Sequence, residues 1–173
     1  ASKSVLESVI VTQVIGNSHV PQRHTLTIDR GISDGTYVGQ PVLDAEGLMG
    51  QLITVYDTHS EVLLISDASH ALPVKVLRNG VRSIAEGNSD FNRLTLRFVP
   101  PTSDIELGDQ LVSSGLGGRF PAGYPVGKIS SIEKTADSEF MSISVEPFAS
   151  LNKSTHLLLV SASGSTEFIG DKR

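Results

Sequence analysis

Short segments in which apolar or β-branched residues alternate with polar ones recur along the whole chain, separated by glycine, proline, asparagine or aspartate. No long segment repeats its apolar positions every 3.6 residues or so, and the pattern therefore predicts an all-β protein. We expect about a dozen short strands, near residues 5–16, 24–29, 40–44, 48–56, 61–66, 73–78, 81–87, 93–98, 110–114, 125–134, 139–146 and 156–161. Asn79 and Gly80 separate two of them and predict a two-residue hairpin, because both residues tolerate positive φ.

An internal repeat groups these strands into two halves. Residues 31–42 match residues 115–126 without a gap, at an offset of 84 residues, and both copies end in Gly-x-Pro-Val. After a short hairpin insertion in the first copy, residues 50–55 match residues 127–132. Self-similarity of this kind indicates a duplicated unit, and a few short strands can remove their exposed edges by curling into a barrel. We predict two small, related six-stranded β-barrels in tandem, joined near residues 79–85, although a strand from the end of the chain could complete the first one.

The glycines and prolines of the repeat have a structural interpretation. A loop that crosses a barrel mouth and leads into a strand through proline needs positive φ and close backbone approach. We assign this purpose to nine residues: Gly31, Gly35, Gly39, Pro41, Gly115, Gly117, Gly118, Gly123 and Pro125.

Composition narrows the classes of function. With 39% hydrophobic and 19% charged residues, 16 Gly and 8 Pro, the chain is typical of a folded, turn-rich protein. The net charge of −5, with scattered basic residues, argues against nucleic acid as a partner. The absence of cysteine excludes disulfides and thiolate chemistry, and the longest apolar stretches are far shorter than the roughly 20 residues of a membrane helix.

A pair of small barrels invites a search for the catalytic triad of trypsin-like proteases. His24, Asp67 and Ser114 occur in the required chain order. The Gly-Asp-Ser-Gly-Gly motif of that class is broken, because a strand-like segment separates Gly108 and Asp109 from the serines. A degenerate serine hydrolase is thus the alternative function, and we predict a protein without catalytic residues.

No cofactor or metal site is predicted. The five histidines lie at positions 19, 24, 59, 70 and 156, without the spacing of metal ligands. The glycine-rich residues 115–118 lack the Lys-Ser/Thr that follows a phosphate-binding loop. Asp104, Glu106 and Asp109 are expected to lie in a solvated turn, not to act as a paired acid and base.

Several segments resemble the MreC family of bacterial rod-shape-determining proteins. Residues 28–35, 39–42 and 47–50 are similar to its first signature, and residues 99–100, 108–112 and 114–129 to its most specific stretch. Residues 63–67 and 73–76 match as well, whereas Arg30, Thr36 and Gln40 vary from the expected residues. The resemblance covers about residues 10 to 160.

The resemblance implies a non-enzymatic scaffold of the cell-wall elongation complex (the elongasome), which acts in peptidoglycan synthesis and controls cell shape. It implies barrels distantly like those of trypsin, on the periplasmic side of a single-pass inner-membrane protein whose anchor has no counterpart here. The implied partners are the elongation-specific penicillin-binding transpeptidase, an MreD-type membrane protein, indirectly the actin-like MreB filaments, and a second copy of the chain bound through a coiled coil. We therefore expect a coiled-coil remnant or linker at 1–12, barrels at 13–83 and 84–161, and a flexible tail at 162–173.

One loop is predicted to bind protein. Residues 119–124 carry Arg119, Phe120 and Tyr124, where the matching loop of the first half is less apolar and uncharged. Arginine and aromatic residues are enriched at binding hot spots. The alternative is that Phe120 plugs the barrel as core and Tyr124 caps it, as aromatic residues near barrel ends often do.

Overall fold

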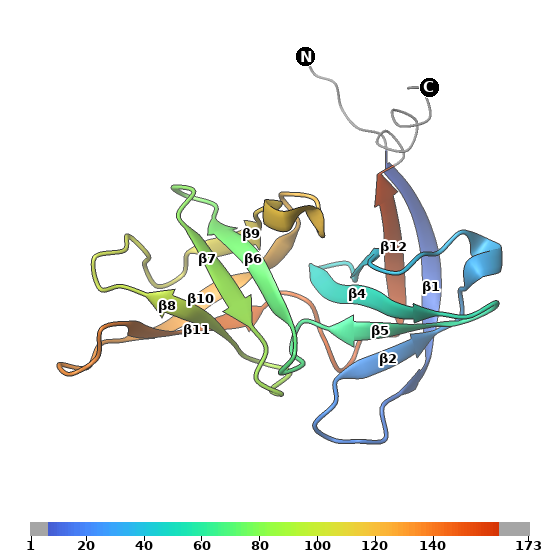
Figure 1. Ribbon diagram of the computed structural model, residues 1–173, viewed down its shortest axis with the longest axis horizontal. Coiled ribbons are helices and arrows are strands. Elements are labelled where there is room, and N and C mark those ends of the chain that lie inside the picture. Colours follow the sequence, from blue (N-terminus) through green and yellow to red (C-terminus); the bar gives the residue numbers. More distant parts are fainter. Residues whose placement is uncertain (1–6, 163–173) are drawn as a thin grey trace, which may run out of the picture.

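The computed structural model describes residues 7–162, which form twelve strands and two short 3-10 turns, η1 (Ile32–Asp34) and η2 (Leu116–Gly118). The strands make two closed six-stranded barrels that lie side by side along the longest axis of the molecule (Figure 1). The prediction of an all-β protein with two six-stranded barrels is thus confirmed. None of the helical segments in this part of the chain is long and apolar enough to cross a membrane.

The first barrel closes in the order β1-β12-β3-β4-β5-β2. Its strands are β1 (Glu7–Asn17), β2 (Thr25–Ile28), β3 (Pro41–Leu43), β4 (Leu48–Val55), β5 (Ser60–Leu64) and β12 (His156–Ala162). Alternation places one face of each strand inward, so that β5 reads buried, half-buried, buried along its length. Fully buried Leu and Ile side chains such as Ile28, Leu52 and Leu64 fill the interior.

The second barrel closes in the order β10-β11-β8-β7-β6-β9. Its strands are β6 (Ala71–Val76), β7 (Arg82–Glu86), β8 (Leu94–Val99), β9 (Gln110–Ser113), β10 (Pro125–Glu133) and β11 (Met141–Pro147). Strands β6 and β7 form the hairpin predicted around Asn79 and Gly80. Its turn spans residues 77–80, and not two residues, because Val76 N–H donates to the carbonyl of Val81.

The predicted boundaries between the barrels are wrong. Strands β6 and β7, assigned wholly or in part to the first barrel at 13–83, belong to the second, and β12, assigned to the second at 84–161, closes the first. Residues 7–12 of the predicted coiled-coil remnant lie in β1, which pairs with β12 along seven registered positions from Glu7↔Ala162 to Gln13↔His156. Residues 1–6 of that remnant and 163–173 of the predicted tail lie outside the described residues.

The two barrels have the same strand topology. In the first barrel the strand equivalent to β6 comes last in the chain, as β12. The first barrel read in the order β12, β1, β2, β3, β4, β5 has the same neighbours as the second read from β6 to β11. Strands β1 to β5 therefore belong to the first barrel, β6 to β11 complete the second, and β12 returns to close the first. This arrangement depends on the pairing of β12 with β1, which lie at opposite ends of the described residues. A prediction that divided the barrels at one point of the sequence could not include it.

The structural repeat also differs from the sequence repeat in its first part. Residues 31–40 connect β2 to β3, whereas residues 114–124 connect β9 to β10, and these loops are not equivalent in the two barrels. The equivalent bonds join Gly39 N–H to Leu52 O in one barrel and Gly108 N–H to Ile129 O in the other. The later part of the match is equivalent, since Gly50 in β4 and Gly127 in β10 each allow close approach of a neighbouring strand that a Cβ would block.

The contacts between the barrels include two histidines and a glycine. The His24 ring, in the first barrel, stacks on Phe91 of the β7–β8 connection, with ring centroids 3.8 Å apart. His70 Nε2, just before β6, lies 3.1 Å from Gln51 Oε1 in β4. Gly87, after β7, passes so close to the main chain of residues 65–67 that a Cβ would clash with it.

Candidate protein-binding surface

His24, Asp67 and Ser114 do not form a catalytic triad. The backbone N–H of His24 donates to Asp67 Oδ2 over 2.8 Å, while its ring Nδ1 lies 2.7 Å from the hydroxyl of buried Ser66. Ser114 lies in the second barrel, where its Oγ accepts the N–H of Leu116. The His24 ring thus bonds neither to the carboxylate nor to the serine that the triad would need.

The acidic residues near Asp109 are organised around one arginine. The Arg78 guanidinium donates to both carboxylate oxygens of Asp109 over 2.9 Å, and also to Asp104 over 3.2 Å. These hydrogen bonds hold the pKa of Asp109 below its ordinary value. Asp109 is buried, in contrast to the solvated turn expected for it, while Asp104 and Glu106 are exposed as expected. The cluster is an ion-pair network at the barrel rim.

The loop between β9 and β10, residues 114–124, is the glycine-rich loop that the sequence singles out. Ser113 closes its base, because its hydroxyl donates to Pro121 O over 2.7 Å and accepts the N–H of Tyr124 over 2.9 Å. Figure 1 shows this loop, with η2, standing out from the end of β9 on the side facing the first barrel. Such a loop has a defined base and an exposed tip.

The three candidate residues of this loop point to different environments. Arg119 is exposed, and its guanidinium donates to Ala71 O over 3.3 Å. Phe120 is buried beside the His70 ring, with centroids 6.0 Å apart, so its ring belongs to the core as in the alternative interpretation. Tyr124 is half-buried against the core, whereas Leu116, which the sequence reasoning passed over, is 53% exposed.

The loop glycines fall into two groups. Gly31, Gly35 and Gly39 lie between β2 and β3, and Gly115, Gly117, Gly118 and Gly123 lie between β9 and β10. Gly39 and Gly123, with φ of 92° and 100°, each stand two residues before the proline that begins a strand. Pro41 at the start of β3 is buried, whereas Pro125 at the start of β10 is exposed.

Sequence reasoning missed an exposed aromatic pair on the second barrel. Phe98 in β8 is 67% exposed, and Phe140 before β11 is 39% exposed. Their rings meet edge to face with centroids 5.4 Å apart. The sequence gives no signal for this pair, because the alternation of Leu94 and Leu96 predicts an inward position for Phe98 that it does not occupy.

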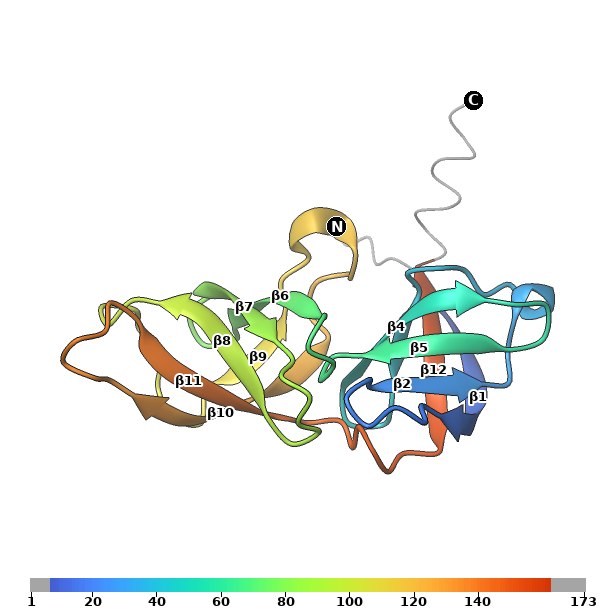
Figure 2. The ribbon, with the colours of Figure 1, turned by 60° about the horizontal axis from the view of Figure 1, so that its bottom comes forward.

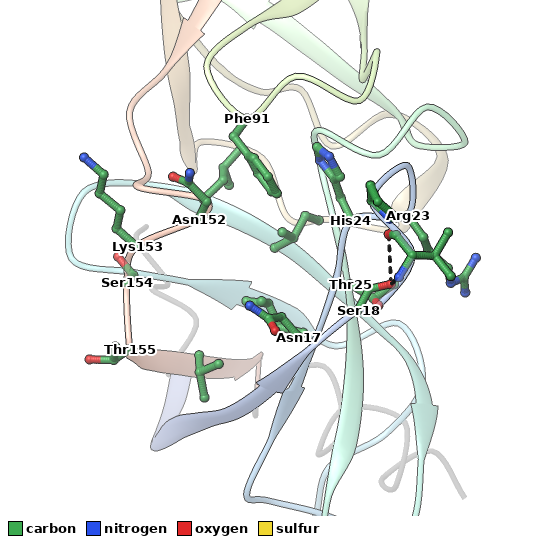
Figure 3. Close-up of a pocket in the computed structure, with 16 residues that line it drawn as sticks. Asn17, Ser18, Arg23, His24, Thr25, Phe91, Asn152, Lys153, Ser154 and Thr155 are labelled. Atoms are coloured by element: carbon green, nitrogen blue, oxygen red, sulfur yellow. Dashed lines mark hydrogen bonds between the residues drawn. The ribbon is translucent and has the colours of Figure 1, made fainter.

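A groove of about 450 Å³ lies where the first barrel meets the β7–β8 connection (Figure 3). Leu26, Leu64 and Leu151 contribute apolar lining, and Asn17, Ser18, Asn152, Ser154 and Thr155 contribute polar lining. In Figure 3 the side chains of Lys153 and Arg23 stand on opposite sides of the groove. Burial lowers the pKa of the His24 imidazole in its wall.

No group of three or more metal-binding side chains gathers anywhere within residues 7–162. The exposed aromatic rings and the groove of this part of the chain are features suited to binding.

Comparison with known proteins identifies the family. The model of the family "Rod shape-determining protein MreC, barrel core" matches residues 14–161. The cell shape-determining protein MreC of Escherichia coli (strain K12) is 46% identical over 154 residues, which cover 89% of this chain and 42% of that protein. Its counterpart in Haemophilus influenzae is 46% identical over 138 residues, covering 80% of this chain and 39% of that protein. The chain thus spans about two fifths of the length of these relatives.

Solved structures of MreC proteins have the same fold as this chain. The crystal structure of MreC from Pseudomonas aeruginosa superposes with a TM-score of 0.85 at 47% identity, covering 88% of this chain and 98% of that one. A Helicobacter pylori MreC, solved in a complex with the penicillin-binding protein PBP2, superposes with a TM-score of 0.69 and covers 91% of this chain and 99% of that one. At 21% identity, this second likeness concerns the fold alone. On the family match, the close relatives and the shared double barrel, this chain belongs to the MreC family of rod shape-determining proteins.

Proposed function

We propose that this chain is the periplasmic part of a non-enzymatic scaffold that controls rod shape by organising the cell-wall elongation complex. The observation that carries the proposal is the family match over residues 14–161. The proposed partners are the elongation-specific penicillin-binding transpeptidase, an MreD-type membrane protein, indirectly the MreB filaments, and a second copy of the chain. The complex of a Helicobacter pylori relative with PBP2 supports the first of these.

The glycine-rich loop is the surface that we propose for the transpeptidase. It has a base held by Ser113 and a tip that exposes Leu116 and Arg119, while Phe120 ties it to the core. A loop held in one conformation loses little conformational entropy on binding, which favours affinity. Arginine beside an apolar side chain is typical of binding hot spots.

The test measures the affinity of the transpeptidase ectodomain, from the same organism, for the chain and its variants. We expect Arg119→Ala combined with Leu116→Ala to weaken binding by about tenfold or more, with an unchanged Tm. Leu107→Ala, which removes a somewhat more exposed leucine from another loop of the same barrel, is the matched control. An ectodomain that does not bind the unaltered chain would overturn the proposed partner.

The non-enzymatic part of the proposal has its own test. The Ser66 hydroxyl lies beside His24 Nδ1 but is fully buried, out of reach of a substrate, and the Ser114 hydroxyl accepts the N–H of Leu116 and does not pair with His24. We expect a fluorophosphonate probe to leave both serines unlabelled by mass spectrometry. Stoichiometric labelling of either one would favour the serine hydrolase instead.

A further inference from the structure

Three connections of the fold meet at the groove beside His24 and Phe91, which we call the inter-barrel groove. Residues 17–25 run from the end of β1 to the start of β2, Phe91 lies between β7 and β8, and residues 151–155 lie between β11 and β12. The volume of about 450 Å³ is within the range of pockets that hold small ligands. Such pockets occur preferentially where domains meet, as this one does.

Hydrogen bonds hold the walls of the inter-barrel groove in place. Buried Asp44 accepts the N–H of Ser150 over 2.8 Å and the hydroxyl of Ser154 over 2.7 Å, so the β11–β12 connection is fixed to the first barrel. Ser89, in the β7–β8 connection, donates its hydroxyl to Gln22 O over 3.3 Å. Because these walls are already in place, the protein loses little conformational entropy when a ligand binds.

Two positive side chains line the groove, and neither is paired. Arg23 and Lys153 are exposed and stand on opposite sides of the groove (Figure 3). Among residues 7–162, neither side chain has an ion-pair or hydrogen-bond partner, and the same holds for the side-chain amides of Asn17 and Asn152. No carboxylate belongs to the lining. The groove therefore presents free positive charge and free amide donors.

The carboxylates near the groove are used by the fold. Arg23 attracts buried Asp67, but the oxygens of that carboxylate accept three hydrogen bonds from neighbouring groups of the fold. Asp90, which also acts on the groove electrostatically, lies 3.9 Å from Arg93 Nε. Neither carboxylate lines the groove, so the charges of Arg23 and Lys153 are left for a ligand.

The remaining lining is uncharged and partly apolar. Leu26, Leu64 and Leu151 contribute to it, and the Phe91 ring stacks on the His24 ring. Burial lowers the pKa of His24, so this ring is uncharged at neutral pH. The groove thus combines positive charge on two sides with uncharged, partly apolar surface, which complements an acidic ligand that also has an apolar group.

We propose that the inter-barrel groove binds a short, extended acidic segment of a partner protein, with carboxylates at Arg23 and Lys153 and an apolar side chain between them. In an extended segment the side chains of the first, third and fifth residues lie on one face and span about 13 Å. A neutral or basic segment would take both cations out of water without a partner, which is unfavourable. The inference goes beyond the proposed function, because no residue of the glycine-rich loop lines this groove.

A peptide tests the groove directly. The probe is acetyl-Asp-Ser-Leu-Ser-Asp-amide, which in an extended conformation carries both carboxylates and the leucine on one face. It is added to the isotopically labelled chain and followed by NMR. We expect saturable shifts of the amides of residues 17–25, of Phe91 and of residues 151–155. A peptide with Asn for both Asp residues, and another with Ser for Leu, should each bind about fivefold more weakly or worse.

Variants of the chain locate the site. Arg23→Gln and Lys153→Gln each remove one exposed, unpaired charge, so we expect a nearly unchanged Tm and an affinity for the probe reduced by about fivefold. Rising ionic strength should weaken binding to the unaltered chain more than binding to the double variant. Lys134→Gln, which removes an exposed lysine between β10 and β11, is the matched control and leaves the affinity unchanged.

The outcomes are decisive without the transpeptidase, so they do not depend on the proposed function. The proposal is overturned if the acidic probe causes no saturable shifts in the groove, or if it binds no more tightly than the asparagine peptide. Binding that both groove variants leave unchanged would place the peptide elsewhere and overturn it as well. Phosphatidylglycerol vesicles that bind the chain through Arg23 and Lys153, while the peptide does not bind, would assign the groove to anionic lipid instead.

Discussion

At the scale of single residues, His70 links stability to pH. Its ring is buried between the barrels, with Nε2 beside Gln51, Phe120 nearby and Nδ1 unpaired. Burial, assisted by the positive charge of Arg119 and opposed by the negative charge of Asp67, lowers the pKa of His70 to about 4. The folded protein therefore binds this proton only near and below about pH 4.

This lowered pKa predicts a loss of stability as pH falls. Between about pH 6.5 and about pH 4 the unfolded chain takes up the proton at His70 and the folded chain does not, so unfolding is favoured. We expect the free energy of unfolding to fall across this window by on the order of 2–3 kcal/mol from this residue. Urea melts of the chain and of His70→Gln at intervals between pH 7 and 4 measure it, and the variant has the shallower slope.

His24 and Asp109 also contribute to the dependence of stability on pH. Burial also lowers the pKa of His24, which adds to the same slope, and His24→Gln measured alone separates the two. Asp109 has a lowered pKa because of Arg78, so its contribution lasts until pH falls below the ordinary aspartate value of 3.8. Equal slopes for the chain and both histidine variants would contradict the assignment.

At the scale of elements, β12 is the strand on which the first barrel depends. It pairs with β1 at seven positions and also contacts β3 at Leu158↔Leu43 and Leu159↔Val42. Leu157 and Leu159 are fully buried in the core. Without this strand, β1 and β3 would each have an open edge and the core a large void.

We therefore predict that a chain ending at residue 155 loses the first barrel and keeps the second. Hydrogen exchange should show rapid exchange of amides in β1 and β3, while amides in β10 and β11 stay protected. A chain ending at residue 162 is the matched control. Loss of protection in both barrels would show instead that they fold as one unit.

At the scale of the whole molecule, close main-chain approach holds the barrels in one relative orientation. Gly87 lies against residues 65–67, and Ser89 N–H donates to Ser66 O over 2.8 Å. On the other side, a Cβ on Gly47 would lie 2.9 Å from Pro125 O of the second barrel. Figure 2 shows the two connecting segments passing between the barrels.

Gly87→Ala should loosen this contact without unfolding either barrel. The added methyl group meets backbone, which cannot move aside as a side chain can. We expect a larger radius of gyration in small-angle scattering and faster proteolysis between residues 65 and 70. Gly80→Ala, at an exposed turn glycine with positive φ and open space around it, is the control for strain without a clash, and it leaves the radius unchanged.

The sequence by itself determined much of this protein, because local patterns report local structure. Alternation located most strands, the Asn79-Gly80 turn located a hairpin, and motif resemblance identified the family.

Only the tertiary structure decided the features that depend on contacts across the chain. The return of β12 to β1 joins residues more than 140 positions apart, which no local pattern encodes. The burial of Phe120 depends on packing beside His70, and the outward Phe98 on a bulge set by its pairing with β11. Strand pairing and side-chain burial are properties of the closed barrel, so they follow from its geometry and not from the order of residues within a segment.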